Sequence, residues 1–168
     1  MNASSLAGTA AAKTEHPREV LSFRLGTEEY GIDILKVQEI RSYEAPTRIA
    51  HAPAYLKGVI NLRGVIVPVV DLRQRFGAAE AGIDGFTVTI VLHLGQRTVG
   101  VVVDSVSDVL ELAAETVKPA PAIACAIDAA YITGLASLPE RTLILLDIQA
   151  LLSAADMGLS DIAVAAAH

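Results

Sequence analysis

The feature that most limits how this chain can fold is an internal repetition of glycines, apolar residues and acidic residues. At a shift of 69 residues the matched pairs are Phe23 with Leu92, Gly26 with Gly95, Gly31 with Gly100 and Glu39 with Asp108. At a shift of 76 residues they are Gly58 with Gly134 and Asp71 with Asp147. Because turn glycines, one apolar face and an aspartate recur in the same order, we interpret the chain as two duplicated halves.

Each half contains short segments with the alternation that is typical of β-strands. Val20–Leu25, Tyr30–Ile34 and Thr87–Leu94 place apolar residues on one face. Leu35–Ile40 has an ambiguous period that fits a strand or a helical turn, and Ala54–Lys57 is predicted to be one helical turn. Short strands with frequent turn signals and no long helix favour a small closed barrel in each half, because closure removes exposed edges.

The stretch from Gly58 to Leu72 reads as a β-hairpin. Two β-branched runs flank Asn61-Leu62-Arg63-Gly64, and Gly64 is suited to the positive φ of a tight turn. Pro68 lacks an N–H and should therefore lie at an edge or a bulge. Arg63, at the hairpin tip, is either a solvated loop residue or a contact residue, and the sequence leaves both readings open.

Two aspartates mark helix starts. Asp71 is expected to cap a helical turn that runs through Phe76 and ends at Gly77. Asp147 is expected to cap the one longer helix, over residues 148–157, whose apolar residues share a face.

The expected domain is mainly β and covers residues 17–157. It divides into two five-stranded barrel subdomains, about residues 20–82 and 83–157, that share a hydrophobic core because neither half could bury enough apolar surface alone. Exchange of the N-terminal strand between the barrels is an open alternative. Residues 1–16 and 158–168 are expected to be disordered tails, since they are small, polar and without period.

Composition excludes several classes of protein. With 13 basic and 19 acidic residues and a net charge of −6, a nucleic acid or an anionic membrane surface is not the expected partner. The single cysteine, Cys125, rules out an internal disulfide and is expected to be a passive thiol in a reducing compartment. No apolar run reaches about 18 residues and no secretory signal is recognisable. We therefore expect a cytoplasmic protein that does not insert into a membrane.

The sequence carries no pattern of catalytic or cofactor chemistry. Its four histidines are far apart, and it has no metal-binding spacing and no phosphate-binding glycine motif. Asp71 and Asp147 could form an acid pair, but both already serve as predicted helix caps. We expect no enzyme, no cofactor and no metal.

One charge pair is a candidate binding feature. Glu39 closes an apolar stretch that includes Ile34 and Val37, and Arg63 lies at the hairpin tip. If both lie on the rim of the first barrel, they are within reach of each other. The pair is then either an exposed ion pair of little consequence for stability or a charged marker beside an apolar binding strip.

Four separated blocks carry a resemblance to a known family. They are YGIDILKVQEIR (Tyr30–Arg41), TRIAHAPAYLKGVINLRGVIVPVVDLRQRFG (Thr47–Gly77), LGQRTVGVVVDSVSDVLEL (Leu94–Leu112) and YITGLASLPERTLILLDIQALL (Tyr131–Leu152). Over about residues 18–157 the chain resembles the bacterial chemotaxis coupling proteins of the CheW family. The resemblance implies two five-stranded SH3-like barrels around a shared core, with short helices and a C-terminal helix.

The resemblance also implies a role. Members of this family are adaptors without catalytic activity or cofactors that couple methyl-accepting chemoreceptor tips to the regulatory domain of the histidine kinase CheA in membrane-associated arrays. It implies receptor contacts at Val37, Glu39 and Arg63, with Val88 in the same region, and Ile34 belongs to the adjoining apolar strip. Kinase contacts in the family use apolar barrel ends, and association of the chain with itself or with CheA in rings is open.

A second class of function remains open from the sequence. Two barrels that meet at an apolar seam could hold a small molecule, so a sensory or ligand-binding module is the rival to a scaffold.

Overall fold

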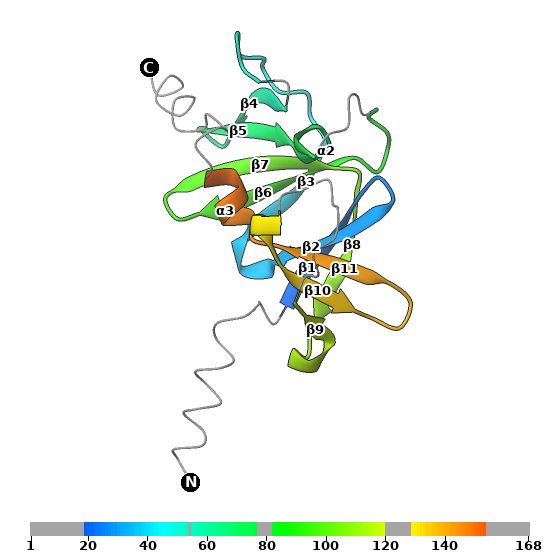
Figure 1. Ribbon diagram of the computed structural model, residues 1–168. Helices are drawn as coiled ribbons and strands as arrows, with labels where there is room; N and C mark the ends of the chain where they lie inside the picture. Colours follow the sequence, from blue (N-terminus) through cyan, green and yellow to red (C-terminus); the bar gives the residue numbers. More distant parts are fainter. Residues whose placement is uncertain (1–18, 54, 77–81, 120–128, 154–168) are drawn as a thin grey trace.

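The computed structural model describes residues 19–53, 55–76, 82–119 and 129–153, and strands dominate these residues (Figure 1). The elements in chain order are β1 (Glu19–Leu25), β2 (Glu28–Asp33), η1 (Ile34–Lys36), β3 (Val37–Ser42), β4 (Leu56–Leu62), β5 (Val65–Asp71), α2 (Leu72–Arg75), β6 (Val88–Leu94), β7 (Arg97–Val103), β8 (Ser105–Glu111), η2 (Ala114–Thr116), β9 (Val117–Lys118), η3 (Ala129–Tyr131), β10 (Ile132–Ser137), β11 (Thr142–Leu146) and α3 (Ile148–Ser153). The predicted mainly β fold is confirmed.

The strands form two sheets, and each sheet takes strands from both halves of the chain. The six-stranded sheet has the order β8-β1-β2-β11-β10-β9, and the five-stranded sheet has the order β3-β6-β7-β5-β4. The halves therefore exchange a complete hairpin: β1–β2 pairs with strands of the second half, and β6–β7 pairs with strands of the first. The boundary expected near residue 82 separates the two repeats, whereas the sheets divide the chain differently. Two sheets agree with the expected pair of SH3-like barrels.

Strand register confirms the duplication. Equivalent antiparallel pairs are Leu21 opposite Val109 and Ile90 opposite Ile40. Equivalent parallel pairs are Leu145 opposite Gly31 and Val69 opposite Gly100. The turn glycines also agree, because Gly26 has φ 64° and Gly95 has φ 63°. Gly58 and Gly134 each follow a register irregularity in their strand, so both shifts read from the sequence correspond to equivalent positions in the fold.

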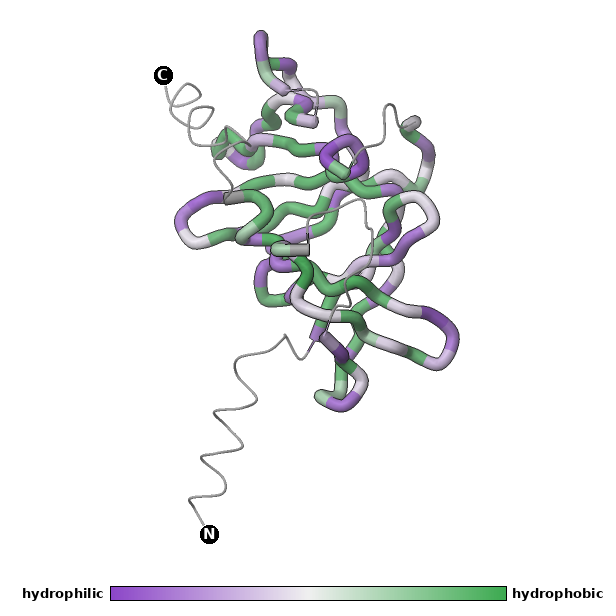
Figure 2. Tube along the Cα trace, in the orientation of Figure 1, coloured by the Kyte–Doolittle hydropathy of each residue, from purple (hydrophilic) through white to green (hydrophobic). Residues whose placement is uncertain are grey.

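Three apolar clusters make up the core. The largest lies between the sheets and joins Leu21 and Phe23 of β1 to their repeat equivalents Ile90 and Leu92 of β6. One smaller cluster belongs to each sheet: β4, β5, β6 and β7 contribute to one, while β1, β10 and β11 contribute to the other together with Leu112. Figure 2 shows the apolar residues gathered along the central strands, with hydrophilic residues at the connections. The predicted shared core is confirmed.

Two local predictions need correction. Leu56 and Lys57 are not in a helical turn: they begin β4, because Leu56 pairs with Val70 and buries its side chain in the shared cluster. The ambiguous stretch resolves into both of its alternatives, since the 3-10 turn η1 over Ile34–Lys36 leads directly into β3. Ile34 accordingly lies in η1 and not at the end of the second strand.

Both predicted aspartate caps are present. The Asp71 carboxylate accepts a hydrogen bond from the Arg73 backbone N–H at 3.0 Å, and Asp147 accepts one from the Ala150 N–H at 3.0 Å. Pro68 lies immediately before the residues of β5 that pair with β7, so the ladder on that side starts after it. The predictions for Cys125 and for the two tails lie outside the described residues.

Candidate functional site

The tip of the β4–β5 hairpin is a two-residue turn with an unusual residue in it. Leu62 pairs with Val65, and the two residues between them both have positive φ, 53° at Arg63 and 89° at Gly64. This is the pattern of a type I′ turn, whose twist matches that of the flanking strands. The Asn61 side chain stabilises the turn by accepting a hydrogen bond from the Gly64 N–H at 2.8 Å. The predicted positive φ of Gly64 is confirmed, and that of Arg63 was not foreseen.

An arginine is a poor choice for this backbone conformation. A residue with a Cβ loses about 1–2 kcal/mol in the left-handed region, where glycine and asparagine are the usual occupants. The side chain of Arg63 is 65% exposed, so apolar packing does not explain its presence. Backbone strain of this kind is typical of functional positions, and the guanidinium is the group that the turn presents.

The guanidinium meets the carboxylate that the sequence paired with it. Arg63 Nη2 donates to Glu39 Oε2 at 2.6 Å, and Arg41 Nη1 lies 3.9 Å from the other oxygen of Glu39. The hydrogen bond from Arg63 is the main reason that the pKa of the Glu39 carboxyl lies below its ordinary value of 4.5; partial desolvation opposes this shift, and the charges of Arg63 and Arg41 add to it. The predicted contact between Glu39 and Arg63 is confirmed.

The apolar residues of the candidate site line part of the same edge. Val37 opens β3 and pairs with Leu92, and both Ile34 and Val37 are half-buried against the shared cluster. Val88 is also half-buried against this cluster, but it pairs with Ser42 at the far end of β3. Three residues of strand separate that pairing from the one at Glu39, about 10 Å along the sheet. The structure therefore groups Ile34, Val37, Glu39 and Arg63 more closely than it groups Val88 with them.

Exposed apolar side chains continue this edge. Leu35 in η1 is 85% exposed and Ile40 in β3 is 43% exposed. The sequence analysis did not single them out, because the ambiguous period of this segment left their orientation open. Because β3 is an edge strand of its sheet, these side chains flank Glu39 at an accessible sheet edge.

The pockets near this region are small. One, of about 230 Å³, lies under the β3–β4 connection between Tyr43, Arg48 and Leu56, and another, of about 200 Å³, lies beside Val65 and Thr98. Both volumes fall below the roughly 300–1,000 Å³ of pockets that enclose a drug-sized ligand. Among the described residues no cluster of three His, Cys, Asp or Glu side chains is arranged to hold a metal ion, and no helix has the length and apolar character to cross a bilayer.

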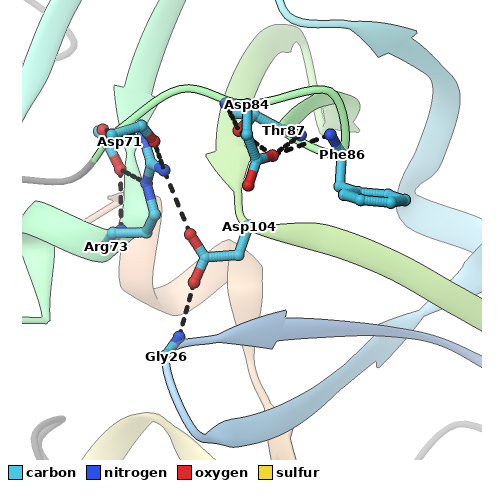
Figure 3. A network of polar contacts seen from close by, with 8 residues as sticks. Gly26, Asp71, Arg73, Asp84, Phe86, Thr87 and Asp104 are labelled. Carbon is cyan, nitrogen blue, oxygen red and sulfur yellow. Dashed lines mark hydrogen bonds and ion pairs between the residues drawn. The ribbon is translucent and has the colours of Figure 1, made fainter.

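A buried charge network, shown in Figure 3, was missed by the sequence analysis. Arg73, with only 4% of its side chain exposed, donates from Nε and Nη2 to the two carboxylate oxygens of Asp71, each at 3.0 Å. Its Nη1 donates to Asp104 at 3.1 Å and to the Gly82 carbonyl at 2.7 Å. Burial opposes the charged form, but Asp71 and then Asp104 outweigh this effect and raise the pKa of Arg73 above 12.5. The available signal was an arginine two residues after a capping aspartate, in an otherwise apolar stretch.

Comparisons with known proteins agree with the fold. A model of the CheW-like domain family matches residues 19–156. The chemotaxis protein CheW of Klebsiella aerogenes is 58% identical over 144 residues, which is 86% of this chain and 87% of that protein. The probable chemotaxis protein CheW of Rhizobium etli is 37% identical over 136 residues, which is 81% of this chain and 88% of that protein.

A solved structure gives the same assignment. The scaffolding protein TtCheW from Thermoanaerobacter tengcongensis superposes with a TM-score of 0.75 at 31% sequence identity, over 82% of this chain and 94% of that one. The family model covers well over half of the chain, and the relatives match along most of their own length. The chain is therefore a member of the CheW family.

Proposed function

We propose that this chain is a non-enzymatic adaptor that couples methyl-accepting chemoreceptors to the histidine kinase CheA in bacterial chemotaxis. The similarity to CheW proteins from two bacteria and to a scaffolding protein of the same family supports a coupling role. In this proposal the protein is cytoplasmic and is recruited to membrane-associated receptor arrays through its partners. The partners are the cytoplasmic tip of the receptor and the regulatory domain of the kinase.

The receptor surface that we propose is the β3 edge with the β4–β5 hairpin tip. Glu39 and Arg63 provide its charged centre, Ile34 and Val37 its apolar part, and Val88 its far end. The observation that carries this assignment is Arg63, which occupies a strained turn position and presents an exposed guanidinium to Glu39 at 2.6 Å. A charge pair beside accessible apolar side chains has the composition of a protein-binding surface.

Charge reversal tests the surface. Glu39→Arg and Arg63→Glu should each weaken binding to a purified receptor-tip fragment at least about tenfold, because an interfacial charge that loses its partner is costly. The same changes should lower the melting temperature by only a few degrees, because an exposed pair contributes little to folding. Binding is measured by titration calorimetry, and stability by thermal melts followed by circular dichroism.

A matched control and a double variant separate the explanations. Glu140→Arg reverses an exposed carboxylate in the equivalent β10–β11 hairpin, and it should leave receptor binding unchanged. The double reversal Glu39→Arg with Arg63→Glu should restore stability but not binding. If it restores binding, the two residues matter only to each other and the proposed receptor contact is wrong. If either single reversal unfolds the protein, the pair is structural and the assignment also fails.

A further inference from the structure

Within the described residues, the chain crosses between the two sheets at two equivalent junctions. One joins β2 to β3 through η1, and the other joins β7 to β8 through Asp104. The repeat shift of 69 residues places Leu35 in the first junction at the position of Asp104 in the second. The two junctions therefore occupy corresponding places, and the side chains that hold them can be compared directly.

The β7–β8 junction is held by charged and backbone contacts from both sheets. The Asp104 carboxylate accepts from the Gly26 N–H in the β1–β2 turn at 2.7 Å and from Arg73 Nη1 at 3.1 Å. The Asp104 backbone N–H donates to the Arg24 carbonyl at 3.1 Å. In Figure 3, Asp104 lies between the Asp71–Arg73 pair on one side and the turn at Gly26 on the other. One side chain thus joins the six-stranded sheet to the end of the five-stranded sheet.

Arg73 extends the same contacts toward the candidate surface. It binds Asp71 at the end of β5 through two parallel hydrogen bonds, which fix the orientation of the guanidinium. It also donates to the Gly82 carbonyl at 2.7 Å, in the segment that leads into β6 and Val88. Because the Arg73 side chain is only 4% exposed, solvent does not compete for these bonds.

The equivalent contacts at the β2–β3 junction are weaker. Gln149 occupies the place of Arg73 at the shift of 76 residues, and Leu35, 85% exposed, occupies the place of Asp104. The hydrogen bond from Lys36 Nζ to Gln149 Oε1 at 3.0 Å has an uncharged acceptor. One junction is therefore braced by a buried ion network and the other is not.

We infer that Arg73 and Asp104 are positioning residues that fix the orientation of one sheet relative to the other, so that partners bound to this adaptor are held in a productive arrangement. This inference rests on the proposed function for its consequence in the complex. Its structural part concerns this chain alone. An adaptor with intact contact surfaces but a loosened brace would bind each partner and fail to couple them.

Two variants test the brace on the full-length chain. Arg73→Gln installs the residue found at the equivalent position, and Asp104→Asn removes the charge while keeping an acceptor for the Gly26 N–H. Lys36→Met, which breaks only the contact with Gln149, is the matched control. Residual dipolar couplings of backbone amides in the two sheets report whether a single alignment tensor fits both. Titration calorimetry gives the affinities for a receptor-tip fragment and for the kinase regulatory domain, and a kinase activation assay gives the coupling.

The inference predicts one alignment tensor for the wild type and for Lys36→Met, and different tensors for the two sheets in both brace variants. It predicts binary affinities within about twofold of wild type and kinase activation reduced at least about tenfold. If Arg73→Gln does not fold, Asp104→Asn decides alone. Brace variants with one shared tensor, or with full kinase activation, overturn the inference. A wild type that binds neither fragment refutes the proposed function instead, and the dipolar couplings still decide the structural part.

Discussion

At the scale of single residues, Arg63 and Glu39 combine a local cost with a functional gain. The turn would be more comfortable with asparagine or glycine at position 63, yet the chain places there a long cation whose head group reaches Glu39 at 2.6 Å. Sequence reasoning found the pair because a lone arginine at the tip of an apolar hairpin is conspicuous. It did not find the positive φ of Arg63, because the pattern around Gly64 fixes only the glycine.

The strain at Arg63 predicts that stability and binding respond in opposite directions. Arg63→Asn creates Asn-Gly, the preferred pair for a type I′ turn, and should raise the melting temperature by about 2–4 °C. The same change removes the guanidinium and should weaken receptor binding. Thermal melts and binding titrations check both effects. A lower melting temperature would mean that the ion pair, and not the turn conformation, dominates the stability of the hairpin.

The carboxyl of Glu39 should titrate at an unusually low pH. Its folded-state pKa lies below the ordinary value of 4.5, mainly because Arg63 donates a hydrogen bond to it. A depressed carboxyl pKa contributes stability that is fully present above the unfolded-state value and is lost as the pH falls through the folded-state value. The contribution should therefore be constant from pH 7 to about 5.5 and disappear below 4.5. Carbon-detected NMR titration of Glu39 should give a midpoint below 4.5, and Arg63→Gln should move it upward. An unchanged midpoint in that variant would contradict the assigned cause.

At the scale of elements, local sequence rules worked where one residue determines one feature. Asp71 and Asp147 cap their helices, and Gly26 and Gly95 form equivalent turns. The rules failed at Leu56, where pairing with Val70 and burial in the core overrode a short helical pattern. They also missed the charge network of Arg73, since its partner Asp104 is distant in the sequence.

Gly58 provides an element-scale test. It has φ 143°, and a Cβ added there would lie 1.9 Å from the Thr47 carbonyl oxygen of the segment that crosses over β4. Gly58→Ala should lower the melting temperature by about 5–15 °C, because backbone must move. The control is Gly64→Ala, where φ is 89° and nothing lies within 4 Å of the added Cβ. Its cost is conformational strain alone, about 2–4 °C. Equal losses in the two variants would show that the contact with Thr47 is unimportant.

At the scale of the whole molecule, duplication and exchange explain the architecture. The repeat in the sequence predicted two similar units around a shared core, and the equivalent strand pairs confirm it. The exchange of complete hairpins between the sheets is not determined by local pattern. A β1–β2 hairpin carries the same alternation whichever sheet it joins, so only the packing of the assembled core decides its place.

The exchange predicts that neither half folds alone. A chain divided between residues 79 and 80 leaves each fragment without a hairpin that its sheet requires, so each should be unfolded by circular dichroism. An equimolar mixture should recover the native amide NMR spectrum, because the fragments together supply both sheets. A fragment that folds by itself into a stable barrel would contradict the exchanged topology as the basis of stability.

The most direct test of the adaptor function is co-sedimentation of the kinase regulatory domain with membranes that carry chemoreceptors. We predict that the kinase domain sediments with these membranes when the wild-type chain is added, and that it stays in the supernatant without the chain or with the Arg63→Glu variant. Sedimentation of the kinase domain to the same extent without the chain, or failure of the wild-type chain to join the receptor pellet, would contradict the account.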